Sequence, residues 1–122
     1  FELSDNQLLT LSGGNTATTT QAAARETDGV NAAMAYGTDG NLSALNLKVL
    51  ADSKNVQPYY RPAPIVREEV LNEYPEIEDI LGPVFSSLDL ETLQTLNARI
   101  AVQGEDAGSV AEDYLTENGF LE

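Results

Sequence analysis

The sequence has 122 residues, with 20 acidic side chains against 6 basic ones, a formal net charge of −14, and neither Cys nor His. A chain this acidic repels phosphate backbones and anionic membrane surfaces, so we expect no nucleic acid among its partners. The absence of Cys and His excludes thiol nucleophiles, imidazole bases, disulfides and Cys/His zinc sites. The first residue is Phe1 with no leader segment before it, so we expect any targeting segment to have been removed.

The first part of the chain alternates short apolar runs with a helix-forming segment. Residues 8–12 form an apolar run that indicates a strand. Residues 16–27 are rich in Ala and predict a helix with Asn15 or Thr16 as its cap. Further strands are expected at residues 30–36, 46–51 and 63–67. This strand–helix–strand order predicts an α/β fold with a parallel sheet.

From residue 67 onward, apolar residues recur at helical spacing. In this part of the chain, the one extended segment that we expect is brief and lies at residues 99–102. The spacing and the capping residues predict helices at about residues 67–73 and 75–82, after Asp89, and after Asp106.

Little in this sequence indicates catalysis. Gly13 and Gly14 stand between an expected strand and an expected helix, but their spacing matches no phosphate-binding loop. Acidic pairs such as Glu68-Glu69 are expected to be solvated helix faces, and nothing singles out one carboxylate pair for hydrolysis. We therefore expect no catalytic residue, no metal site and no cofactor.

Three tyrosines are candidates for binding a ligand. Tyr36 closes an apolar run just before a Gly-Thr-Asp-Gly turn at residues 37–40, and ligands of open α/β sheets bind at the carboxyl ends of strands. Tyr59 and Tyr60 lie in the polar, Pro-bearing connection at residues 52–62, where a core tyrosine is less expected. On the residues alone, a binding role and a structural role both stay open for all three.

The segments around these tyrosines resemble a known family. The runs VNAAMAYGTDG (residues 30–40), LKVLADSK (47–54) and PYYRPAPIVR (58–67) are similar, in this order, to the glycine betaine/carnitine/choline substrate-binding proteins of ABC importers. The helical segments that follow also look like the C-terminal helices of this family. The resemblance covers roughly residues 8–120, and this chain matches about the C-terminal half of the family.

The resemblance implies a fold and a division of the chain. The family has a two-lobed, type II periplasmic-binding-protein fold, in which ligand binds between two α/β lobes joined by crossover strands. Residues 1–56 would form part of the second lobe, residues 57–66 the crossover and hinge, and residues 67–122 the mostly helical C-terminal part of the first lobe. The expected fold class is therefore an α/β fragment, with short parallel strands early and helices toward the C-terminus.

The resemblance also implies a site. Members of the family hold a quaternary ammonium group in a box of tyrosines, a cation–π site whose ring faces attract a cation that cannot donate hydrogen bonds. Two of these tyrosines correspond to Tyr36 and Tyr60, and Tyr59 is a weaker candidate. Thr38 and Asp39 match a polar turn that either lines the cleft or forms only the turn, and the turn is favoured for Asp39.

Two functions follow as hypotheses. The first is a non-catalytic substrate-binding component of an ABC importer for glycine betaine, choline, carnitine or a similar solute. It would act outside the cytoplasm, as a periplasmic or lipoprotein-anchored protein, and deliver its ligand to a membrane permease. The alternative is a truncated interaction module without a ligand site, which forms a homodimer through exposed sheet edges.

Overall fold

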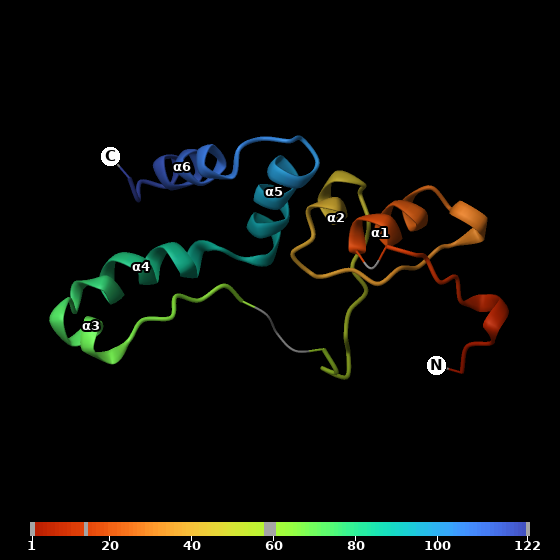
Figure 1. Ribbon diagram of the computed structural model, residues 1–122, viewed down its shortest axis with the longest axis horizontal. Coiled ribbons are helices and arrows are strands. Elements are labelled where there is room, and N and C mark those ends of the chain that lie inside the picture. Colours follow the sequence, from red (N-terminus) through yellow and green to blue (C-terminus); the bar gives the residue numbers. More distant parts are fainter. Residues whose placement is uncertain (1, 14, 58–60, 122) are drawn as a thin grey trace.

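The structure is a computed structural model that describes residues 2–13, 15–57 and 61–121. Within these ranges the regular elements are helical. Two are short 3-10 turns, η1 (Asp5–Gln7) and η2 (Thr27–Gly29). The α-helices are α1 (Thr16–Ala24), α2 (Gly40–Ala44), α3 (Glu68–Glu73), α4 (Glu76–Ser87), α5 (Leu90–Ala101) and α6 (Ala107–Glu117). Figure 1 shows α1 and α2 toward one end of the molecule, α3 and α4 toward the other, and α5 near α2.

The expected parallel sheet is wrong for the described part of the chain, where no segment is assigned to a strand. A helix closes its backbone hydrogen bonds within itself, whereas a strand needs a neighbour that completes its ladder. Most of the expected strands instead run as single connecting stretches (Figure 1), and the expected extended segment near residue 100 lies largely within α5. The segments corrected in this way are residues 8–12, 30–36, 46–51, 63–67 and 99–102.

Three of the α-helices begin at a capping side chain that the sequence predicts. In each, a side-chain oxygen accepts a hydrogen bond from the backbone N–H three residues later, which satisfies one of the free amides of the first turn. The pairs are Asn15 with Thr18 at 3.0 Å, Asp89 with Thr92 at 2.8 Å, and Asp106 with Ser109 at 3.0 Å.

Two helices differ in length from the prediction. α1 ends at Ala24 because Glu26 and Asp28 have φ angles of 53° and 52°, in the left-handed region, where a right-handed helix cannot continue. α4 continues to Ser87, five residues past its predicted end at residue 82, with Pro83 in its interior. Pro83 is exposed, so solvent can reach the carbonyl that a proline leaves without its helical N–H partner.

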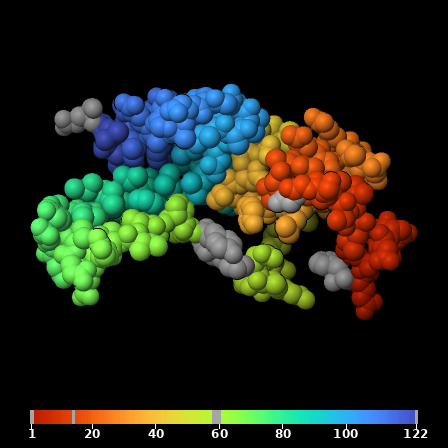
Figure 2. All heavy atoms as spheres, viewed as in Figure 1, coloured from red at the N-terminus to blue at the C-terminus, as the bar shows by residue number. Residues whose placement is uncertain are grey.

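The few buried side chains of the described residues lie on α1 and where α5 meets α2 and α6. Leu42 of α2 and Ala98 of α5 are both buried, and these two helices pack directly against each other. Val110 of α6, which also packs on α5, is only 1% exposed. Figure 2 shows the first third of the chain in contact with this later helical part. The division of the chain at residues 57–66 stays a prediction.

Candidate functional site

Tyr36 lies at the end of an extended stretch, directly before the turn that leads into α2. The residue is 66% exposed and lines two adjoining hollows of the surface. The first hollow, of about 340 Å³, is bounded by the beginning of α1. The second, of about 400 Å³, lies between the beginnings of α1 and α2 and the last turns of α5. Tyr36 is therefore the ring that both hollows share.

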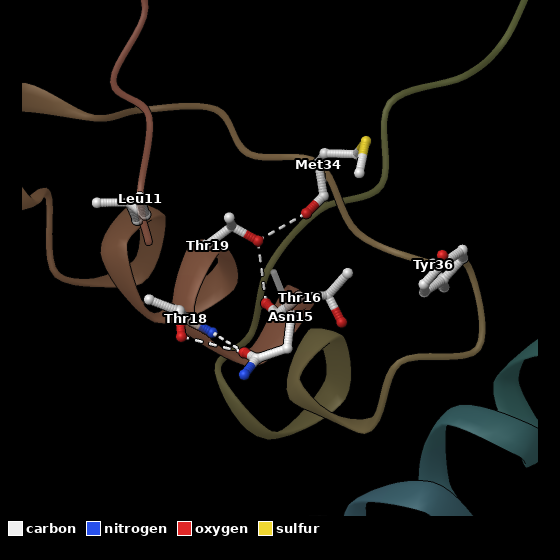
Figure 3. A pocket seen from close by; sticks show the side chains of 7 residues that line it. All are labelled: Leu11, Asn15, Thr16, Thr18, Thr19, Met34 and Tyr36. Carbon is white, nitrogen blue, oxygen red and sulfur yellow. Dashed lines mark hydrogen bonds between the residues drawn. The ribbon is translucent and has the colours of Figure 1, made fainter. Parts of the chain in front are cut away.

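The wall of the first hollow is fixed by threonine hydroxyls of α1. Thr19 Oγ1 donates a hydrogen bond to the Met34 carbonyl oxygen at 2.8 Å, which ties the extended stretch to the helix. Figure 3 shows this bond and the Asn15 cap of α1, with the Tyr36 ring lying apart from both on the side of α5. These bonds lie across the hollow from the ring. The direction of the Tyr36 ring therefore depends on the backbone turn that follows it.

The turn after Tyr36 is closed by backbone and carboxylate hydrogen bonds. The Asp39 N–H donates to the Tyr36 carbonyl oxygen at 3.0 Å. Asp39 Oδ1 accepts from the backbone and the side-chain amides of Asn41, at 3.0 and 3.1 Å, and Oδ2 accepts from the Thr16 hydroxyl. Both carboxylate oxygens are thereby used within the fold. Asp39 therefore closes the turn and caps α2, and it also lines the second hollow.

α5 contributes two residues to the site that the sequence did not indicate. Gln94 Nε2 donates to the Gly37 carbonyl oxygen at 2.6 Å, and Asn97 Nδ2 donates to the Thr38 carbonyl oxygen at 2.7 Å. Residues three apart share one face of a helix, so both amides reach the same turn. In the sequence, the only sign of this role is that the Gln94 and Asn97 side chains stand beside the apolar face of a predicted helix. That pattern does not identify partners that lie nearly 60 residues away.

The predicted site residues fall into two groups. Tyr36 and Thr38 lie on one turn, and both line the hollow against α5. Tyr59 and Tyr60 lie outside the described residues.

Within the described ranges, no three carboxylates lie together as metal ligands would, and no helix is long and apolar enough to cross a membrane. An exposed ring among hydroxyls and amides suits a small organic cation.

Residues 3–117 match a family described as the substrate binding domain of the ABC-type glycine betaine transport system. The chain is 60% identical over 120 residues to the glycine betaine-binding protein YehZ of Escherichia coli, and the match covers 98% of this chain and 39% of YehZ. It is 40% identical over 85 residues to a glycine-betaine-binding protein of Pseudomonas aeruginosa, covering 70% of this chain and 27% of that protein.

The solved structure of apo YehZ from Escherichia coli contains a similar arrangement. Its TM-score with this chain is 0.88 at 60% identity, and the match covers 99% of this chain and 43% of that one. The chain thus spans less than half the length of these relatives. The matched proteins are binding proteins, and the family belongs to a transport system rather than to a class of enzymes. The chain belongs to the family of substrate-binding domains of ABC-type glycine betaine transport systems.

Proposed function

We propose that this chain is part of the substrate-binding component of an ABC importer for quaternary ammonium solutes such as glycine betaine, choline or carnitine. The family match and the glycine betaine-binding relatives support this proposal. The structural observation that carries it is the Tyr36 ring, which is exposed at the rim of two hollows. The nearby Asp39 carboxylate is already engaged by Thr16 and Asn41.

The chemistry of the ligand fits such a site. A quaternary ammonium group has no N–H to donate, so aromatic faces bind it through the attraction between its charge and the ring quadrupole. Tyr36 supplies one such face. We propose that Tyr60 supplies a second, with Tyr59 as the weaker candidate, and that Thr38 lines the cleft beside them. The binding itself requires no catalytic residue, metal or cofactor.

The proposed role also fixes where the protein works. An importer collects its solute outside the cytoplasm, so we propose an extracytoplasmic location and a membrane permease as the partner. Ligand binding would favour a closed form that the permease recognises.

Replacement of the proposed cage tyrosines tests this function. In the full-length protein, Tyr36→Ala and Tyr60→Ala should each weaken glycine betaine binding by about 1–2 kcal/mol in isothermal titration, because each removes one face around the desolvated cation. Tyr36→Phe keeps the ring and should keep most of the affinity. Tyr74→Ala is the matched control, because Tyr74 is a half-exposed tyrosine at the end of α3. Unchanged affinity in a cage variant removes that residue from the site.

A second titration separates the charge of the ligand from its shape. In tert-butylacetate a neutral carbon replaces the ammonium nitrogen, while the three methyl groups and the carboxylate stay. A cation–π site should bind this analogue far more weakly than glycine betaine. Equal affinities for the two compounds would contradict a cage built on the charge of the ligand.

Self-association is a second proposed function, favoured by the exposed apolar side chains of the extended segments. Leu50 is 79% exposed and Ile65 is 99% exposed, and both lie on stretches without a paired strand in the described part of the chain. Apolar side chains beside unpaired backbone groups invite pairing with a second copy. We propose that this homodimer is the alternative to a role in ligand binding.

Light scattering over a range of concentrations tests this alternative. A homodimer through these segments should show a mass that rises toward twice the monomer value, and Leu50→Glu should return it to the monomer. Ile80→Glu is the matched control, because Ile80 is 62% exposed but lies on α4. A monomer mass at all concentrations would rule out the homodimer.

A further inference from the structure

One face of α5 contacts the turn that follows Tyr36 and the first residue of α2. Gly37 receives a hydrogen bond from Gln94, and Thr38 receives one from Asn97. Gly40 approaches so closely that an added Cβ would lie 2.4 Å from the backbone nitrogen of Ala98. The three contacting residues of α5 are spaced at i, i+3 and i+4, which places them on one side of the helix.

We propose that Gln94 and Asn97 are positioning residues, which hold the turn at residues 36–39 and so set the direction of the Tyr36 ring. This inference rests on the proposed function for the role of Tyr36 in binding. It assigns the orientation of the ring to α5, a helix that lies more than 50 residues further along the chain.

The exposure of Tyr36 makes such a support necessary. With the residue 66% exposed, little packing restrains the ring, so its direction follows from the backbone that carries it. The Asp39 N–H closes the turn onto the Tyr36 carbonyl, and Asp39 is itself held by Thr16 and Asn41. The amide of Gln94 is the first support after Tyr36, at 2.6 Å from the Gly37 carbonyl oxygen. Its removal should loosen the turn at the point nearest the ring.

Substitution of Gln94 by Met removes the donor while length and helix propensity are kept. In Gln94→Met, hydrogen exchange of the Asp39 amide should become about fivefold faster, because one hydrogen bond that holds the turn is lost. Exchange of the Val110 amide in α6, which donates to the Asp106 carbonyl oxygen at 3.0 Å, should stay unchanged. Asn97→Leu should act in the same direction through the Thr38 carbonyl.

The matched control is Gln21→Met, which makes the same change at an exposed position of α1. It should leave the exchange of both amides unchanged. If the Asp39 amide of Gln94→Met exchanges at the rate of the unaltered chain, the inference is overturned, whether or not the chain binds ligand. If the Asp39 and Val110 amides accelerate together, the effect is a general loss of stability, and the inference is overturned as well.

Titration with glycine betaine then connects the turn to binding. Gln94→Met should weaken binding about fivefold while Gln21→Met leaves it unchanged, since a mobile turn lowers the fraction of chains with a correctly directed ring. Faster exchange at Asp39 without any loss of affinity would overturn the positioning role. If the full-length protein binds no quaternary ammonium compound, the proposed function fails, while the exchange measurement still decides whether α5 holds the turn.

Discussion

At Gly40 the backbone of α2 approaches the backbone of α5 too closely to leave room for a side chain. A Cβ at this position would lie 2.4 Å from the Ala98 nitrogen and 2.5 Å from the Asn97 carbonyl carbon, both of which are backbone atoms that cannot move aside. Gly40→Ala should therefore destabilise the chain by about 1–3 kcal/mol, as overpacking of a close contact does. Urea unfolding followed by far-UV circular dichroism measures this change.

Gly82 offers the matched control for this substitution. It lies inside α4, and a Cβ there would meet nothing within 4 Å. Gly82→Ala should stabilise the chain by about 0.5–1 kcal/mol, because alanine loses less backbone entropy in a helix. Equal effects of the two substitutions would show that the α2–α5 contact is looser than the structure describes.

The residues of the site were predictable only where their role is local. The motif AYGTDG indicated a turn after Tyr36, and the role of Asp39 in that turn follows from hydrogen bonds to residues two and three positions away. Gln94 and Asn97 were missed because their partners lie far along the chain. Long-range contacts of this kind leave no local pattern.

At the scale of elements, the difference between local and long-range determinants explains why helices were predicted and strands were predicted wrongly. A helix depends on its own periodicity and on a cap within three residues, so the beginnings of the helices after Asn15, Asp89 and Asp106 were predicted correctly. A strand depends on a neighbour that its own residues do not specify. The apolar runs at residues 30–36 and 46–51 met the local pattern of strands, yet no paired strand adjoins them among the described residues.

At the scale of the whole molecule, α5 connects the early helices to the last one. It packs on α2 through Ala98 and on α6 through the side chain of Arg99. Arg99 Nη2 donates to Glu105 and to Asp113 of α6, each at 2.6 Å. With 20 acidic and 6 basic residues in the chain, one cation shared by two carboxylates offsets part of the repulsion between them.

This ion-pair cluster predicts how stability depends on pH. The hydrogen bonds from Arg99 hold the pKa of Glu105 below its ordinary value, and the hydrogen bonds of Glu105 and then Asp113 raise the pKa of Arg99. A carboxyl group whose pKa is lowered by folding stabilises the folded chain above its ordinary pKa, about 4.3 for Glu. As the pH falls through the lowered pKa, Glu105 becomes protonated in the folded chain as well as in the unfolded chain, and this contribution is lost.

The variant Glu105→Gln therefore should be less stable than the unaltered chain at neutral pH, and the difference should disappear in acid. Thermal unfolding from neutral pH down to about one unit below the ordinary Glu pKa measures the approach of the two curves. Added salt should reduce the difference, because the cluster is partly exposed and its charges are screened. Glu112→Gln removes one exposed negative charge from α6, the helix that carries Asp113, and serves as the control. If the gap between Glu105→Gln and the unaltered chain stays constant from neutral pH into acid, Glu105 contributes through packing rather than through its charge.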